Sequence, residues 1–396
     1  MRKGSIRDVL VGLGAGSLGL MGVGVTVAGA GTPGGWDQPG AFAVQQVLAG
    51  SSLHHTFTPP GSSTTLTEAL SDPDDISRLG GDLFVGFQNG VGPQGQASTD
   101  GNLDSTIVEL TLHGTVVGQW DVAGKADGVT ADPATGSVIA TVNEDANSSL
   151  YTIDPTSSAA VQHYSYSEPL PHDGGTDAIS VYFGRIFISA SAPGTTGTNP
   201  APQPTFPAAY SVTLDAGTSV AAVTPLFSDE DTATVANIGR WGQQVTLALT
   251  DPDSNAVVPI FSPRFGGDFE LTSQGDLQQI DVRDPGGPRQ QLSVLNLSQS
   301  VDDTAWATDP SGRLYSTDSA DDAVDVVTGP FRWGQELAVA TPCGANSAPS
   351  TCPGPGYPAN YLASLDPWTG QVSGVEVQGV PYVPQGGLVF VAGWDR

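Results

Sequence analysis

The chain has 396 residues, a length that fits one large domain or two of ordinary size. Its formal net charge is −28 at pH 7, which opposes binding to nucleic acid and to anionic membrane surfaces. Short apolar runs alternate with turn-forming residues, among them 51 glycines and 31 prolines, and this pattern predicts an all-β domain with many connections.

The N-terminus is predicted to be an export signal. Arg2, Lys3 and Arg7 precede a charge-free run that ends in the small residues Ala28 and Ala30, a pattern typical of a cleaved secretory signal. We therefore expect a secreted protein with a signal peptide at residues 1–30 and a lead-in at 31–49; an uncleaved N-terminal anchor is the alternative. Removal of three basic residues and one acid would leave a mature net charge of −30.

Beyond this segment one phrase recurs, in which an acid precedes one or two small or polar residues and then a β-branched residue. The phrase occurs as PDDIS at Asp75, KADGV at Asp127, GTDAI at Asp177 and VDDTA at Asp303. The first three acids lie 52 and 50 residues apart, and a second short apolar run follows each one. A period of about 40–50 residues built from short strands is typical of β-propeller blades.

The repeats predict a single β-propeller domain at residues 50–396. Its complete blades are expected at residues 74–125, 126–175, 176–229, 230–301 and 302–376. The irregular fourth blade is expected to have its inner hairpin at Val245–Phe261. The C-terminal GGLVFVAG would form an inner strand and residues 52–70 an outer half, so that pairing of the two ends closes the ring without an open edge. This gives six blades, with seven as the alternative count.

The phrases ADGVTADPATG at 126–136 and SLYTIDP at 149–155 resemble those of secreted bacterial β-propellers of the six-bladed lactonase-like and NHL-like type. The resemblance covers nearly all of residues 50–396 and implies an architecture more than an activity, because propellers host many functions. Lactonase-like propellers hold a divalent cation at the channel mouth through acidic and Asn side chains. The ligand set of that family is not matched residue by residue here.

The acid of each repeated phrase is the candidate site. Inner strands of a propeller line its channel, so Asp75, Asp127, Asp177 and Asp303 are expected to converge at one channel mouth, with Asn237 as a further member. Calcium or another divalent cation suits such oxygen ligands. The alternative is structural: each Asp would accept hydrogen bonds from the backbone of the neighbouring blade, and repetition in every blade favours that role.

The cysteines, the histidines and the search for a serine nucleophile motif add no further candidate for a catalytic or metal site. Cys343 and Cys352 predict one disulfide in an exported protein. The five histidines (His54, His55, His113, His163 and His172) have no partner at a useful spacing and are expected at the surface. Residues 31–396 contain no G-x-S-x-G nucleophile motif, so no catalytic residue is assigned.

These features predict a secreted, acidic, monomeric binding or scaffold module, for which a cation in the channel is an open alternative. Its partner is expected to be a protein, a small molecule or a carbohydrate, with no nucleic-acid partner and no membrane domain beyond the signal segment. A metal-dependent lactonase or ester hydrolase that uses the Asp ring is the less favoured alternative. No organic cofactor is expected.

Overall fold

The computed structural model describes residues 41–194, 205–341 and 360–395, and strands make up nearly all of their regular structure. Helical turns in this part are limited to four 3-10 segments: η1 Gly50–Ser52, η2 Pro171–Asp173, η3 Ile238–Arg240 and η4 Gly393–Asp395. None of the described helical segments has the length and apolar character needed to cross a bilayer. The expected signal peptide and the expected Cys343–Cys352 disulfide lie outside the described residues.

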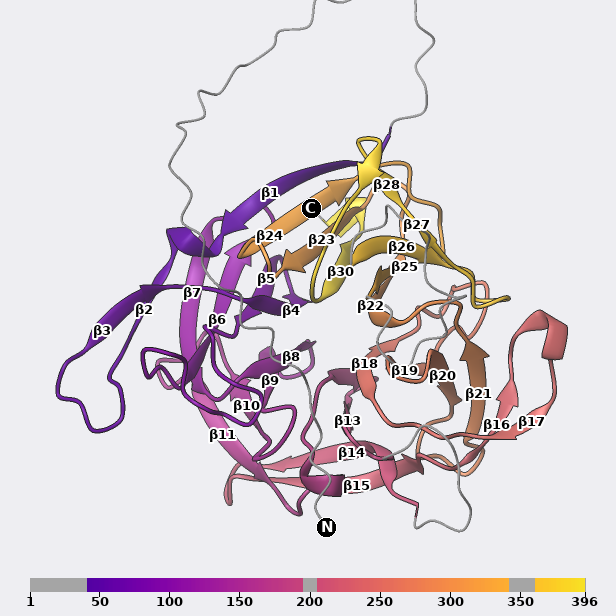
Figure 1. The fold of residues 1–396 in the computed structure, drawn as a ribbon, viewed down its shortest axis with the longest axis horizontal. Coiled ribbons are helices and arrows are strands. Elements are labelled where there is room, and N and C mark those ends of the chain that lie inside the picture. Colours follow the sequence, from indigo (N-terminus) through magenta and orange to yellow (C-terminus); the bar gives the residue numbers. More distant parts are fainter. Residues whose placement is uncertain (1–40, 195–204, 342–359, 396) are drawn as a thin grey trace, which may run out of the picture. The chain divides into compact units, whose positions relative to one another are not determined.

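Three blades are continuous stretches of chain, each a four-stranded antiparallel group (Figure 1). The strands are β4 Pro73–Leu79, β5 Asp82–Phe87, β6 Asp104–Thr111, β7 Val116–Ala123, β8 Ala126–Asp132, β9 Ser137–Val142, β10 Ser149–Ile153, β11 Val161–Tyr166, β12 Ile179–Tyr182, β13 Arg185–Ser189, β14 Pro207–Asp215 and β15 Val220–Ser228. Their bounds agree with the three blades expected between residues 74 and 229. The second and third blades share one sheet, because β11 and β15 pair in parallel at their outer edges.

Local sequence explains these hairpins. Two residues, Phe183 and Gly184, connect β12 to β13, and both have positive φ angles, of 47° and 78°. Positive φ at both central residues is the type I′ geometry that matches the twist of a tight hairpin. Large apolar side chains then fill the space between neighbouring blades, as where Phe187 of β13 meets Phe269, with ring centroids 5.0 Å apart. Burying one such side chain contributes about 2–3 kcal/mol.

The fourth blade differs from the expected one. Its strands are β18 Pro252–Val257, β19 Phe269–Ser273, β20 Gln278–Arg283 and β21 Gln291–Asn296, with β16 Thr232–Val235 and β17 Gln244–Thr246 added outside β21. The expected inner hairpin at Val245–Phe261 is therefore wrong, because β17 lies at the outer edge and β18 pairs with β19. Leu247 and Leu249 gave this run its strand-like pattern; they are buried in the core but belong to a connection.

The last two blades are interleaved. The inner strand β22 Val301–Ala307 pairs with β25 Gln335–Ala340, followed by β26 Tyr361–Leu365 and β27 Val372–Gly374. Between β22 and β25 the chain enters the neighbouring sheet as β23 Arg313–Asp318 and β24 Ala323–Thr328. The expectation of one blade at 302–376 is therefore wrong. The carboxylate of Asp309 accepts a hydrogen bond from the amide of Gly393, which joins the turn before β23 to the C-terminal segment.

Both ends of the described chain meet in the sheet β1–β24–β23–β30. The C-terminal strand is β30 Leu388–Val391, as expected, but the N-terminal strand is β1 Ala43–Ala49 and not residues 52–70. The two terminal strands are not hydrogen-bonded to each other, because β23 and β24 lie between them. Two small hairpins complete the elements: β2 His54–Phe57 with β3 Leu66–Ala69, and β28 Glu376–Val377 with β29 Val380–Pro381.

The inner strands β4, β8, β12, β18, β22 and β30 follow one another in a closed ring, each in contact with the next (Figure 1). Residues Pro39–Arg396 form one compact unit around this ring. The chain is a β-propeller. The count of six blades, against seven, remains a prediction that these six described inner strands favour.

Candidate functional site

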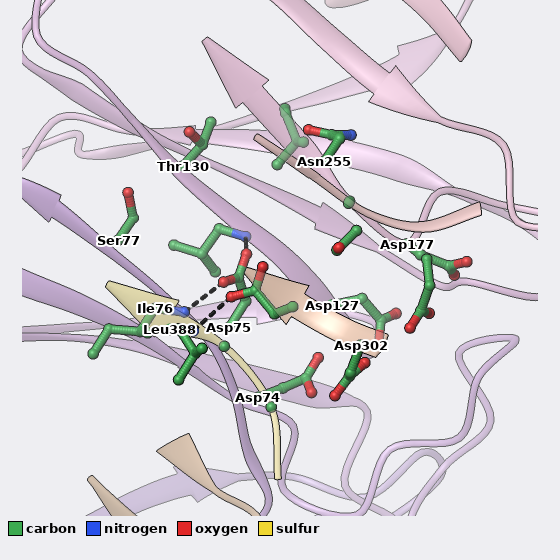
Figure 2. Close-up of a pocket in the computed structure, with 18 of the residues that line it drawn as sticks. Asp74, Asp75, Ile76, Ser77, Asp127, Thr130, Asp177, Asn255, Asp302 and Leu388 are labelled. Carbon is green, nitrogen blue, oxygen red and sulfur yellow. Dashed lines mark hydrogen bonds between the residues drawn. The ribbon is translucent and has the colours of Figure 1, made fainter. Parts of the chain in front are cut away.

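The inner strands enclose a central cavity of about 480 Å³ (Figure 2). Its lining comes from the six inner strands, from residues shortly before them, and from four residues that follow second strands: Gln88 after β5, Glu144 after β9, Gln274 after β19 and Ser319 after β23. Acidic side chains gather toward one end: Figure 2 shows Asp74, Asp177 and Asp302 there, with Ser77, Thr130 and Asn255 toward the other end. The cavity is therefore polar at one mouth and mixed along its walls.

Bulges in the inner strands direct these acids into the cavity. The pairing register shifts near the start of β4, β8, β18 and β22, and a bulge of this kind turns a side chain away from its regular direction. The first residues inside the shifts are Asp74, Asp127, Asp253 and Asp302, and Asp177 holds the equivalent position just before β12. In three of the shifts a second residue follows: Asp75, Gly128 and Asp303. The five aspartates in the first position, Asp177 included, are called the Asp ring from here on.

The sixth inner strand contributes a glycine at this position. Gly386 has φ +128°, and a Cβ atom there would lie 2.5 Å from the carbonyl oxygen of Asp74. No side chain fits in so small a space. The ring consequently has no carboxylate from β30.

Two of the four acids predicted from the sequence belong to the Asp ring, and two do not. Asp127 and Asp177 are members. The carboxylate of Asp75 instead accepts hydrogen bonds from the amide of Val129 in the next inner strand, at 2.6 Å, and from the amide of Ile76, at 2.7 Å. Asp303 likewise accepts from the amide of Leu388 in the next strand, at 2.6 Å. Asp75 and Asp303 also line the cavity, and these hydrogen bonds give them the structural role that the sequence left open.

Three ring members were missed by the sequence prediction, and one candidate was wrong. Asp74 and Asp302 are the first residues of the two Asp-Asp pairs, whose second residues were chosen. Asp253 was missed because its phrase, DPDSNAVV, places three residues between the acid and the first β-branched residue, Val257. The expected member Asn237 lies outside the cavity lining, where its amide donates to the carbonyl oxygens of Asn296 and Thr369.

A lysine ammonium neutralises one half of the ring. The Nζ atom of Lys125 lies 2.7 Å from Asp127 Oδ1 and 2.7 Å from Glu144 Oε1, and Gln88 donates to the same Asp127 oxygen at 3.0 Å. Burial alone would lower the pKa of Lys125, but the two carboxylates outweigh burial and raise it. Lys125 is therefore a permanently charged, tethered counter-ion.

The other half of the ring consists of Asp177, Asp253 and Asp302, and within the described residues none of these forms an ion pair with a basic side chain. The Gln274 amide donates to Asp253 at 2.7 Å and to Asp302 at 3.3 Å, so it bridges the two carboxyl groups. Burial and the neighbouring carboxylates raise the pKa of Asp177 and of Asp253 well above the usual value. This half carries an excess of acceptors.

Several buried polar atoms around the cavity lack partners among the described residues. They are Asp127 Oδ2, the hydroxyls of Ser180 and Ser254, and both amide atoms of Asn255. Asp127, Ser180 and Ser254 are only 6%, 6% and 9% exposed. A buried polar group left without a partner costs about 1–3 kcal/mol, so these atoms favour an occupant with polar groups of its own.

The ring as it stands is not a tight metal cage. Among the residues that the structure describes, no group of three or more His, Cys, Asp or Glu side chains is arranged to hold a metal ion. The carboxylates therefore surround a space that is wider than a bare ion. They can pair with a larger cation, or with a metal ion after the side chains move inward.

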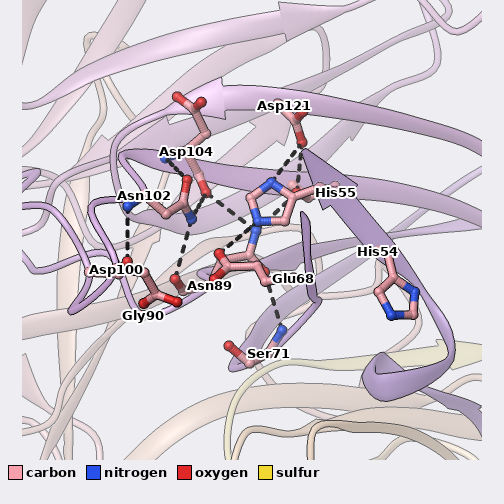
Figure 3. Close-up of polar contacts among 12 residues, drawn as sticks. His54, His55, Glu68, Ser71, Asn89, Gly90, Asp100, Asn102, Asp104 and Asp121 are labelled. Carbon is pink, nitrogen blue, oxygen red and sulfur yellow. Dashed lines mark hydrogen bonds and ion pairs between the residues drawn. The ribbon is translucent and has the colours of Figure 1, made fainter. Parts of the chain in front are cut away.

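A second polar cluster surrounds His55, which is 3% exposed (Figure 3). Its Nε2 atom lies 2.9 Å from Glu68 of β3, and its Nδ1 atom lies 3.7 Å from Asp121 of β7. The expectation that His55 lies at the surface is therefore wrong. Its ring is buried between Glu68 of the same hairpin and Asp121 of β7, and the contact with Asp121 holds the hairpin β2–β3 against β7. The other four histidines are exposed, as expected.

Comparisons with known proteins find similar folds and no sequence family. No protein-family model matches it, and no curated protein matches its sequence. Among solved structures it is similar to the periplasmic gluconolactonase of Pseudomonas aeruginosa, with 13% identity, TM-score 0.39, and coverage of 85% of this chain and 94% of that one.

Two further structures have similar values. The β-propeller domain of Myceliophteria thermophila Cps50 (Swd1) has 10% identity, TM-score 0.42, and coverage of 82% and 91%. The chain covers 66% of Kuenenia stuttgartiensis hydrazine synthase, with 11% identity, TM-score 0.38 and 78% of this chain included. Similarity at this level carries no argument about function, so function has to be argued from the cavity.

Proposed function

We propose that this protein is an exported binding module whose central channel takes a cation at the Asp ring. The observation that carries the proposal is the convergence of five carboxylates, from five inner-strand positions, on one mouth of a cavity. Only one ammonium, that of Lys125, lies against them in the described part of the chain. The fold itself does not select a function.

The charge balance of the ring supports a cation from solution. Asp127 and Glu144 share the single positive charge of Lys125, whereas Asp177, Asp253 and Asp302 have no ion-pair partner among the described residues. Taking a carboxylate out of water costs several kcal/mol unless a counter-charge and hydrogen bonds replace the lost hydration. A bound cation would offset this cost, and calcium, which prefers oxygen ligands, is one candidate.

The test is a calorimetric titration and thermal unfolding of EDTA-treated protein with calcium, magnesium and alkylammonium chlorides. The ring variant is Asp253→Asn/Asp302→Asn, which keeps side-chain size and hydrogen bonding. The matched control is Asp100→Asn/Glu376→Gln, which removes the same charge at exposed positions. We expect at least one cation to bind and to stabilise the wild type and the control but not the ring variant. Equal responses in all three proteins, or no response to any cation, would refute the proposal.

The carboxyls of Asp253 and Asp302, which the Gln274 amide bridges, favour a second candidate, a metal-dependent lactonase or ester hydrolase. Two adjacent carboxyls with different pKa values provide one group that can accept a proton and one that can donate it. A panel of lactones and esters, assayed with and without EDTA, tests this. Turnover that EDTA and Asp302→Asn both abolish would support the enzyme; cation binding without turnover on the panel would leave the binding module.

A further inference from the structure

The structure already places one ammonium group, that of Lys125, against the Asp ring. Lys125 enters from the connection between β7 and β8 and places its ammonium 2.7 Å from each of two carboxylates, with its side chain only 16% exposed. A lysine ammonium has three N–H donors and no acceptor. Asp127, Glu144 and the adjacent Gln88 thus form a buried ammonium site that the chain itself fills.

The opposite half of the ring has the same chemistry without the ammonium. Asp177, Asp253 and Asp302 come from three successive inner-strand positions, and Gln274 bonds to two of them much as Gln88 bonds to Asp127. Three carboxylates offer the acceptors that three N–H donors need. This half therefore offers acceptors for a cation, and none of its three carboxylates forms an ion pair with a basic side chain of the described residues.

The size of the cavity argues for an organic cation over a bare metal ion. A volume of about 480 Å³ is far more than an ion needs and lies within the roughly 300–1,000 Å³ of small-molecule pockets. The carboxylates are also not grouped as metal ligands in the described residues. The cavity can therefore hold an organic ligand whose uncharged part is attached to the charged group; this uncharged part is called the ligand body.

The walls next to the ring show what such a body would contact. Ile76, Val129, Ile179 and Leu388 supply apolar surface in the cavity lining. Among them lie the buried, unpartnered polar groups of Ser180, Ser254 and Asn255. An aliphatic body that carries a hydroxyl or a similar group would satisfy both kinds of wall.

We propose that the channel ligand is an organic primary amine with a hydroxylated aliphatic body, whose ammonium pairs with Asp177, Asp253 and Asp302 beside the ammonium of Lys125. This inference rests on the proposed function, since it names the class of cation. Loss of one carboxylate charge removes a charge-assisted hydrogen bond and should therefore weaken binding at least roughly tenfold.

The experiment is a calorimetric titration of the full chain with 4-aminobutan-1-ol, its uncharged counterpart butane-1,4-diol, and calcium chloride. The variants are Asp253→Asn/Asp302→Asn and the control Asp100→Asn/Glu376→Gln. We expect the amine to bind the wild type and the control, to bind the ring variant at least tenfold more weakly, and to bind more tightly than the diol in every protein with an intact ring.

Three results would overturn this inference. Equal binding of the amine and the diol would show that the ammonium is not recognised. Amine affinity that is unchanged in the ring variant would place the amine elsewhere. Calcium binding that depends on the ring, with no amine binding, would refute the ligand class and leave the proposed function standing, whereas binding of neither cation would refute both.

Discussion

Replacement of Lys125 by methionine tests whether a tethered ammonium neutralises the Asp ring. Methionine keeps much of the apolar stem and removes the charge. The Lys125 and Asp127 side chains are 16% and 6% exposed, so their contact is a buried ion pair, and removing one partner of such a pair costs about 3–5 kcal/mol. Glu144 is 31% exposed, and its lost contact adds less than about 1 kcal/mol. We expect the free energy of unfolding at pH 7 to fall by about 4 kcal/mol.

The assay is urea denaturation of four proteins: the wild type, Lys125→Met, Asp127→Asn and the double variant. Because the double variant has no uncompensated carboxylate at position 127, it should recover much of the stability that Lys125→Met loses, with a coupling energy of at least about 2 kcal/mol. A loss below about 0.5 kcal/mol in Lys125→Met, or additive effects in the double variant, would refute the role of Lys125 as counter-ion.

Three further changes test other parts of the account. Asp75→Ala removes two charge-assisted hydrogen bonds between and within inner strands, so it should lower the free energy of unfolding by about 2–4 kcal/mol in urea titrations; loss of cation binding in a folded Asp75→Ala protein would instead make Asp75 a ligand. Burial raises the pKa of Glu336 from 4.5 to about 8, so the folded chain keeps a proton that the unfolded chain loses. The contribution of Glu336 to the free energy of unfolding should therefore be greatest near or below about pH 4.5 and fall as the pH rises through about 8. Glu336→Gln should flatten this decline when unfolding is measured between about pH 5 and 8.5. An unchanged pH profile in the variant would count against this role of Glu336. His55→Ala should increase hydrogen exchange across β2 and β3 without changing the inner strands, whereas the exposed neighbour variant His54→Ala should have no effect; identical exchange in the two variants would contradict the docking role.

The first three blades could be predicted from the sequence because each one is a continuous stretch with local hairpins. The period of 52 and 50 residues between acids follows directly from that continuity. The interleaving of β22 and β23 could not be predicted in the same way. Both runs have ordinary strand patterns, and their pairing with β25 and β30 depends on contacts with segments far along the chain.

The composition of the Asp ring was only partly predictable for a similar reason. In the pairs Asp74–Asp75 and Asp302–Asp303 the first acid lies two residues before a β-branched residue, as Asp127 and Asp177 do, so this spacing could have identified the ring member. Both residues of each pair lie inside a bulge, and a bulge is set by the register with the partner strand. Lys125 stood two residues before Asp127, yet only the fold brings Glu144 to it.

The most direct test of the cation-binding channel is anomalous diffraction from crystals soaked separately with terbium chloride and with 4-bromobenzylammonium chloride. The account predicts an anomalous peak inside the cavity with at least one of the two soaks, beside Asp253 and Asp302 and absent from crystals of Asp253→Asn/Asp302→Asn. Peaks confined to the outer surface, or a cavity peak that persists in the variant, would contradict the claim that this ring of carboxylates binds a cation.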